Sequence, residues 1–224
     1  SSQLIDVLCR LNPRAGVIPA PDALEDRLAR LPGDARRSRS DDPHGPLLAG
    51  QPPLTDTEGV QLMEFRARRP FHPQRLHDAV DVLLDGVIRA RGRLWLASNP
   101  AQVMWLESAG GGLRVSSAGR WLAELTDSEL AYVDPERRAL AAAMWDDEHG
   151  DRHTSMTVLL CGAGQEDVTD TLRGALLTDD ELRHPQRWPT WADPFGDWHE
   201  EPCTDNPGRP AQSLIGDTTE GDHE

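Results

Sequence analysis

The stretch GRLWLASNPAQVMWLESAGGGLRV, residues 92–115, has the most regular hydrophobic pattern in the chain. Its first part continues a predicted strand over residues 87–98, and an Asn-Pro turn separates that strand from a second one over residues 101–108. The glycines that follow tolerate a positive φ, so they predict a tight turn into a third strand, residues 113–119. The stretch therefore predicts three antiparallel strands joined by short turns.

The first two of these strands carry apolar side chains on both faces. Because neighbours along a strand point to opposite sides of a sheet, we expect the aliphatic residues on the core side and two tryptophans on the other side. Large apolar side chains usually pack, so we expect the tryptophans to cover the edge of a half-covered sheet. The expected core set is Leu94, Leu96, Met104 and Leu106, and the opposite set is Trp95 and Trp105.

The surrounding sequence supplies further strands and helices. Residues 60–69 and 152–162 are predicted to be strands, whereas residues 72–86, 134–145 and 165–177 carry apolar residues at helical spacing. This order of elements predicts an α+β fold, an antiparallel sheet with helices packed mainly on one face.

Four regions follow one another along the chain. Residues 1–20 hold an amphipathic helix and a short strand-like run, too little to fold alone. Residues 21–59 combine a helix with a linker rich in Pro, Gly, Asp and Arg. Residues 60–197 form the predicted domain, and residues 198–224 predict a disordered acidic tail. The apolar stripe of the first helix consists of Leu4, Ile5, Leu8 and Leu11.

Composition excludes several classes of protein. The formal net charge is -15, and all 23 cationic residues are arginine. Without lysine the chain cannot contain the phosphate-binding loop GxxxxGK[ST], so it is not a P-loop NTPase by itself. No apolar run approaches the roughly 20 residues that span a bilayer, and the 3 cysteines form no CxxC pair. We therefore expect a cytoplasmic protein with no membrane partner.

Several segments in this order resemble the C-terminal domain of CobW-type GTPases, P-loop metallochaperones that handle zinc or cobalt. They are RPFHPQRL, GRLWLAS, MWLESAGGGLRVSSAGRWL, GDRHTSMTVLLCG and ALLTDDE, and the resemblance extends over about residues 60–195. Residues 1–20 are similar to the last helix and strand of the family's GTPase domain. The phosphate loop, the CxCC metal motif and the NKxD motif of that domain are absent from this sequence.

The resemblance implies a regulatory and interaction domain with no catalytic or cofactor-binding residue of its own. GTP and Zn²⁺ are implied only for the full-length family protein, and the implied partners are a client protein and the missing GTPase domain. The segment of residues 91–115 most resembles the branch that recruits a ribosome-hibernation factor during zinc limitation. A ribosome-associated recruitment module is therefore the alternative function.

On each of two predicted strands, residues 60–69 and 87–98, the alternation of side chains places the arginines on one face. If the two strands were neighbours, the arginines and one tryptophan would form a basic-aromatic patch suited to RNA phosphates and unstacked bases. The alternative is that the guanidinium groups pair with Glu64, Glu107 and other nearby acids on a solvated face. The candidate partner or RNA-binding residues are Arg66, Arg68, Arg89, Arg91, Arg93 and Trp95.

Metal ligands have one candidate location. The WHEEPC segment brings His199 and Cys203 close together in the acidic tail, where they would hold Zn²⁺, although a solvated tail without metal is the alternative. His149 and His153 are four residues apart, but the Gly-Asp between them and the strand that follows argue against a shared helical face.

Overall fold

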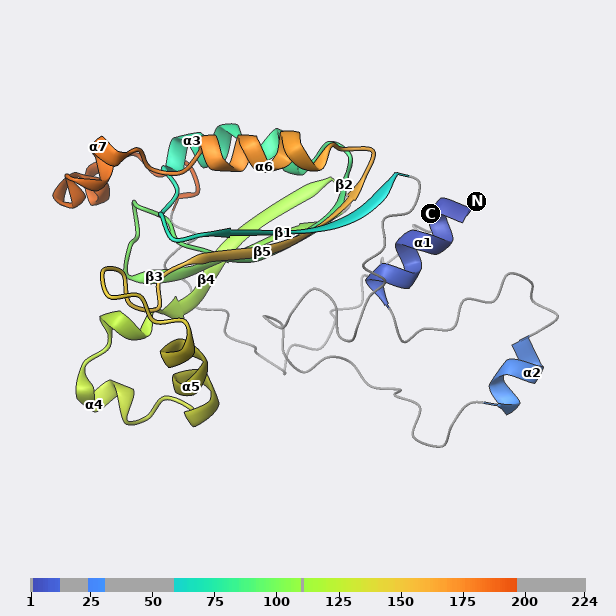
Figure 1. Cartoon of the computed structure of the whole chain (residues 1–224), viewed down its shortest axis with the longest axis horizontal. Coiled ribbons are helices and arrows are strands. Elements are labelled where there is room, and N and C mark those ends of the chain that lie inside the picture. Colours follow the sequence, from blue (N-terminus) through green and yellow to red (C-terminus); the bar gives the residue numbers. More distant parts are fainter. Residues whose placement is uncertain (1, 13–23, 31–58, 110, 197–224) are drawn as a thin grey trace, which may run out of the picture.

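The computed structural model describes residues 2–12, 24–30, 59–109 and 111–196 (Figure 1). These residues contain a five-stranded antiparallel sheet in the order β1-β5-β2-β3-β4. The predicted α+β fold is confirmed. Most of the predicted linker, the strand-like run expected before residue 20 and the predicted tail over residues 198–224 lie outside the described residues. The strands are β1 Val60–Ala67, β2 Val87–Leu94, β3 Gln102–Ala109, β4 Gly112–Arg120 and β5 Thr154–Cys161.

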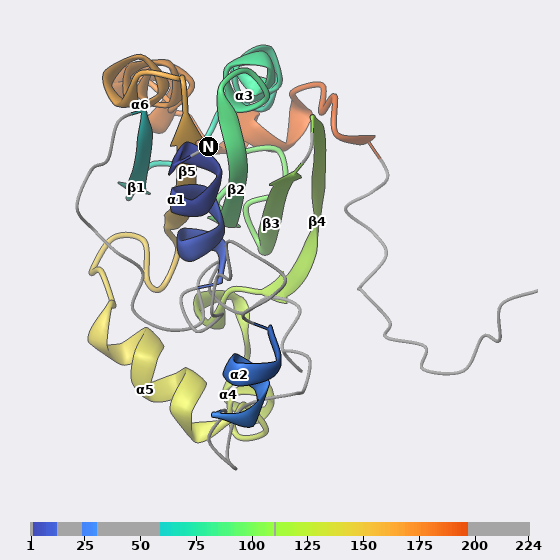
Figure 2. The same ribbon diagram turned by 90° about the vertical axis from the view of Figure 1, so that its right-hand side faces the viewer.

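The last strand of the described residues, β5, occupies an inner position of the sheet. β5 pairs with β1 on one side and with β2 on the other, so β1 and β2 are not neighbours (Figure 2). Gly92 of β2 makes the close approach to β5 possible, because a Cβ atom built there would lie 2.3 Å from Met156 Cα and 2.3 Å from the Ser155 carbonyl oxygen. Any larger residue at this position would push the two strands apart.

Two helices and a 3₁₀ turn cover one face of the sheet (Figure 1). These are α3 Pro73–Asp78, η2 Val80–Leu83 and α6 Gln165–Gly174. The helix predicted over residues 72–86 changes from α to 3₁₀ winding at Ala79. The β-branched residues Val80 and Val82 lie where the winding tightens, which agrees with their weaker helix propensity. The core beneath these helices includes all four predicted residues, Leu94, Leu96, Met104 and Leu106, together with Phe71, Leu76, Val158 and Leu172.

The opposite face is covered at its two ends. α1, Ser2–Leu11, packs Val7 and Leu11 against Leu62, Ile88 and Leu159 at one end. The predicted helix is thus present, but Leu4, Ile5 and Leu8 of its expected stripe are 59%, 40% and 43% exposed.

At the other end of that face lie η3 Leu122–Glu124, α4 Asp127–Leu130 and α5 Pro135–Ala143 (Figure 1). α5 begins as the Asp-Pro pair predicts, because the Asp134 carboxylate accepts hydrogen bonds from the backbone N–H groups of Glu136 and Arg137. The described chain also contains α2 Leu24–Ala29, α7 Asp179–Leu182 and η4 Pro185–Thr190. None of the helices in the described ranges is long and apolar enough to cross a membrane.

A candidate partner-binding surface

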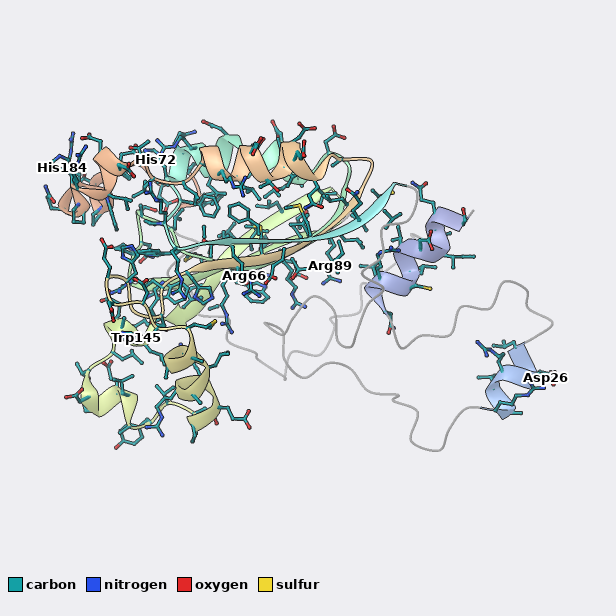
Figure 3. All side chains as sticks on the ribbon, in the orientation of Figure 1. Asp26, Arg66, His72, Arg89, Trp145 and His184 are labelled. Carbon is teal, nitrogen blue, oxygen red and sulfur yellow. The ribbon has the colours of Figure 1, made fainter. Side chains whose placement is uncertain are left out.

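The sheet face that α3 and α6 leave free carries four arginines, which we call the arginine row: Arg66, Arg89, Arg91 and Arg93. Figure 3 labels two of them, Arg66 and Arg89. Arg91 lies opposite Glu107 in the ladder between β2 and β3, and Arg93 lies opposite Trp105. The guanidinium carbon of Arg91 lies 5.3 Å from the centre of the Trp105 ring, a cation–π contact. Arg89 Nη2 is 2.5 Å from Glu107 Oε1, and Arg91 Nε is 3.8 Å from the same oxygen. One carboxylate therefore neutralises part of this row.

Arg66 of β1 lies on the same face of the sheet as Arg93 of β2, with β5 between them. It lies opposite Ser155, which in turn lies opposite Arg93, so small polar residues of β5 separate the two arginines. Arg66 Nε is 2.6 Å from Glu64 Oε1. The basic-aromatic patch required β1 and β2 to be neighbours, but β5 lies between them. The alternative expected from the sequence, that the arginines pair with Glu64 and Glu107, is what the structure contains.

Trp95 lies in a different environment from the arginine row. It is 2% exposed, and its ring packs against His149 at 5.0 Å and Trp188 at 6.3 Å between centroids. The tryptophan beside the arginines is Trp105, which the sequence interpretation did not include among the binding residues. Only the strand register, with Trp105 opposite Arg93, reveals this contact.

A hollow of about 180 Å³ lies between this face and α5, and we call it the α5 hollow. Its walls include Arg93, Trp105, Trp121, Arg137, Leu140 and Met144. A second hollow of about 260 Å³, lined in part by Arg66 and Arg68, shares Met144 and His153 with the first. The sheet and α5 thus enclose a concave surface bearing arginine, aromatic and aliphatic side chains.

The GDRHT sequence at the start of β5 holds this concave surface together. Both carboxylate oxygens of Asp151 accept hydrogen bonds, one from the Leu122 N–H and one from the Ala123 N–H, each at 2.9 Å. Arg152 forms an ion pair with Glu124. These contacts fix η3, and with it the neighbouring wall of the α5 hollow, to the start of β5.

His153 lies in the wall shared by the two hollows. Burial lowers its pKa, and the positive charges of Arg93 and Arg68 lower it further. Its Nδ1 is 2.8 Å from the Asp151 carbonyl oxygen, so the neutral ring donates this hydrogen bond from Nδ1 and keeps Nε2 as an acceptor. At neutral pH the wall that the two hollows share therefore carries an uncharged imidazole, with the charges of Arg93 and Arg68 nearby.

The described residues contain no group of three or more His, Cys, Asp or Glu side chains that could hold a metal ion. His149 and His153 face different tryptophans, Trp95 and Trp121. His199 and Cys203 lie outside the described residues, so the predicted tail site stays a prediction.

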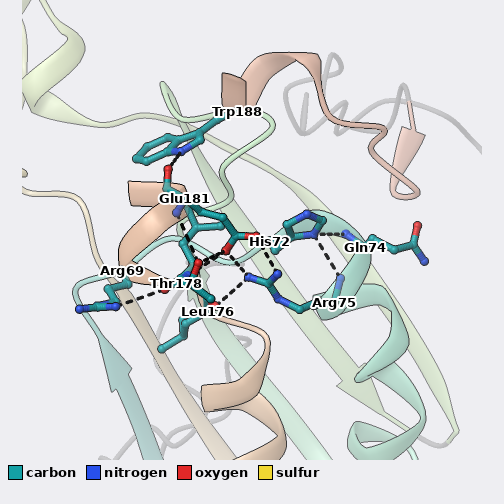
Figure 4. Close-up of polar contacts among 9 residues, drawn as sticks. Arg69, His72, Gln74, Arg75, Leu176, Thr178, Glu181 and Trp188 are labelled. Atoms are coloured by element: carbon teal, nitrogen blue, oxygen red, sulfur yellow. Dashed lines mark hydrogen bonds and ion pairs between the residues drawn. The ribbon is translucent and has the colours of Figure 1, made fainter. Parts of the chain in front are cut away.

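A polar clamp joins the C-terminal segment to the start of α3 (Figure 4). Arg75 donates two hydrogen bonds to the Glu181 carboxylate, at 2.9 and 2.7 Å, and one to the Leu176 carbonyl oxygen at 2.9 Å. The same carboxylate accepts from the Thr178 N–H at 2.8 Å, and the Glu181 carbonyl accepts from Trp188 Nε1 at 2.9 Å. The clamp joins α7 to the start of α3, and Trp188 of η4 packs with Trp95 in a cluster separate from the core under the helices.

Comparison with known proteins identifies the family. Residues 60–176, more than half of the 224 residues, match the family described as the cobalamin synthesis protein cobW C-terminal domain. The chain belongs to this CobW C-terminal domain family. The matched range contains the whole sheet, α3, α5 and α6, so the arginine row and the α5 hollow are built on the family's domain.

Two relatives of this CobW C-terminal domain protein have names that refer to zinc. The chain is 61% identical over 203 residues to the zinc chaperone Rv0106 of Mycobacterium tuberculosis, covering 91% of this chain and 51% of the relative. It is 31% identical over 149 residues to the zinc-regulated GTPase metalloprotein activator 1 of Dictyostelium discoideum, covering 64% of this chain and 31% of the relative. The chain thus spans about half the length of the first of these relatives, and less of the second.

A solved structure is also similar. The Zn(II)-bound YjiA GTPase from E. coli matches with a TM-score of 0.41 and 13% sequence identity, over 79% of this chain and 48% of that chain.

Proposed function

We propose that this chain is the regulatory and interaction part of a CobW-type, GTP-dependent zinc homeostasis protein and has no nucleotide site of its own. The observation that carries the proposal is the 61% identity to a zinc chaperone over 203 residues. The absence of lysine supports the second part, because a phosphate-binding loop requires one. The chain would contact a client protein and couple that contact to the nucleotide state of a GTPase domain.

The test separates nucleotide binding from regulation. A fluorescent GTP analogue is titrated into this chain and, as positive control, into the full-length zinc chaperone of M. tuberculosis. We expect saturable binding by the relative and none by this chain. The chain is then added to the remaining half of that relative, expressed separately, and we expect its GTP hydrolysis rate to change. Saturable GTP binding by this chain, or an unchanged hydrolysis rate, would contradict the proposal.

A second candidate is a ribosome-associated module that recruits a hibernation factor during zinc limitation. The arginine row with its cation–π contact to Trp105 supports it, because stacked arginine and aromatic groups suit RNA. The ion pairs to Glu64 and Glu107 and the net charge of -15 oppose it, since nucleic-acid affinity requires cations that are free to replace counterions.

Co-sedimentation with ribosomes from zinc-replete and zinc-starved cells, at low and moderate salt, tests the second candidate. Arg89→Glu with Arg93→Glu should abolish a specific association. Arg173→Glu with Arg183→Glu makes the same change of charge at exposed positions on α6 and just after α7, and should leave the association intact. Equal loss with both pairs would point to net charge rather than to this surface.

A further inference from the structure

The α5 hollow has the dimensions of a site for a single side chain. Pockets for small molecules and cofactors usually measure about 300–1,000 Å³, whereas this one measures about 180 Å³. It is too small to enclose a drug-sized ligand. One leucine or phenylalanine side chain projecting from a larger partner would be accommodated.

The walls of the hollow suit an apolar anchor. Trp105 and Trp121, which are 7% and 2% exposed, supply rigid aromatic surface. Met144 supplies a flexible thioether that adapts to different shapes, and Leu140, at the edge, is 50% exposed. Buried apolar anchors that fill such pockets usually carry most of the affinity of a protein interface.

The charges around the hollow are mainly positive. Arg93 and Arg137 line it, and Arg66 and Arg68 line the adjoining hollow. Arg137 keeps its guanidinium in place by donating a hydrogen bond to the Arg120 carbonyl oxygen at 2.8 Å. A local positive field on a chain of net charge -15 selects a partner segment of opposite charge.

Two carboxylates near these arginines accept hydrogen bonds from backbone groups. Asp151 uses both oxygens for the N–H groups at the start of η3. Asp146 accepts hydrogen bonds from the backbone N–H groups of His149 and Glu148, which lower its pKa, and the charge of Arg68 lowers that pKa slightly further. Arg137, which is exposed and donates a hydrogen bond to a backbone carbonyl oxygen, is therefore a suitable partner for a carboxylate of a bound segment.

We propose that the α5 hollow binds an acidic segment of a partner protein by inserting one leucine or phenylalanine side chain between Trp105, Trp121 and Met144. A carboxylate beside this anchor pairs with Arg137, and Arg93 adds positive charge to the wall of the hollow. The inference rests on the proposed role of the chain as an interaction domain and specifies the chemistry of its partner. Protein is favoured over RNA because the hollow suits one apolar side chain, and two arginines of the neighbouring row already pair with Glu107.

Fluorescence anisotropy with defined peptides tests the proposal on the full chain. The probe is a fluorescein-labelled peptide with a central Leu-Phe pair and four acidic residues on each side. One control peptide has Gly-Ser at the centre, and the other has lysine in place of the acidic residues. We expect saturable binding of the probe, at least about tenfold weaker binding of the Gly-Ser peptide and no saturable binding of the lysine peptide.

Neighbouring arginines of α5 provide matched variants. Arg137→Gln removes a charge that lines the hollow, and Arg138→Gln removes the same charge from the next, exposed position outside it. We expect about fivefold to tenfold weaker probe binding for Arg137→Gln and an unchanged affinity for Arg138→Gln. Leu140→Asp, which adds a negative charge at the edge, should also weaken binding. Thermal melts establish that each variant is folded.

Several outcomes would overturn the proposal. The first two are equal binding of the probe and the Gly-Ser peptide, and equal effects of Arg137→Gln and Arg138→Gln on probe binding. The third is tighter binding of a single-stranded RNA oligomer than of the probe. The fourth is a dimer in solution in which two copies of the chain bury this face against each other. The assay contains neither GTP nor zinc. Its failure would leave the regulatory role standing, whereas GTP binding by this chain would refute that role without affecting peptide binding.

Discussion

Glu181 should make a measurable contribution to stability that depends on pH. The Arg75 guanidinium, which donates hydrogen bonds to its carboxylate, lowers the pKa of Glu181 from 4.5 to about 2. The side chain is 23% exposed, so solvent screening reduces this interaction less than it would at the surface. Since one pKa unit corresponds to about 1.4 kcal/mol, the ionised carboxylate contributes about 3 kcal/mol to the free energy of unfolding.

The sign of the pH dependence follows from the lowered pKa. The contribution is complete above pH 4.5, the pKa of the free carboxyl group, and is lost as the pH falls toward about 2. Glu181→Gln keeps an oxygen that can accept from the Thr178 N–H but cannot carry the charge. We expect the variant to be about 3 kcal/mol less stable than the parent at pH 7 and about 1 kcal/mol less stable at pH 3.

Urea denaturation followed by far-ultraviolet circular dichroism, at pH 7 and pH 3, measures both differences. Asp180→Asn is the matched control, because Asp180 pairs with Arg183 at 3.0 Å but is 75% exposed, and its loss should cost less than about 0.5 kcal/mol. Tryptophan fluorescence reports whether the segment of Trp188 detaches before the sheet unfolds. A loss below about 1 kcal/mol at pH 7, or one that does not change with pH, would refute the stabilising role assigned to the clamp.

Two further predictions concern packing. Gly92→Ala should lower the free energy of unfolding by about 3 kcal/mol, because its Cβ would overlap β5, whereas Gly174→Ala, with open space around its Cβ, should stay within about 0.5 kcal/mol. Urea denaturation of both variants is the measurement, and equal stabilities would contradict the close approach of β2 and β5. Val7→Asp should abolish hydrogen-exchange protection of α1, because Val7 is 8% exposed, while Leu4→Asp at a 59% exposed position should preserve it. Similar protection in both variants would show that α1 does not pack as described.

Much of the fold could be predicted from local patterns. The alternation in residues 87–108 and the glycine at position 111, with φ 80°, predicted the central strands and their turn. The Asp-Pro pair predicted where α5 begins. These features depend on the period of side-chain direction and on backbone preferences, which act over a few residues.

The buried side of α1 illustrates where local patterns fail. Of the predicted apolar stripe only Leu11 packs against the sheet, together with Val7, whereas Leu4, Ile5 and Leu8 are exposed. A helical period shows that a helix has an apolar side, but the element that it meets decides which residues are covered. The candidate binding residues show the same limit, since the tryptophan beside the arginines is Trp105 and not Trp95.

The sequence by itself determined the class of the fold, most strand and helix positions, the family resemblance and the absence of a lysine-dependent phosphate loop. The tertiary structure decided the placement of β5 between β1 and β2, the pairing of Arg89 and Arg91 with Glu107, and the enclosure of a hollow by α5. The physical reason is that strand order and register join residues far apart in the chain. Their contacts depend on the packing of the whole domain and leave no periodic signal in any one segment.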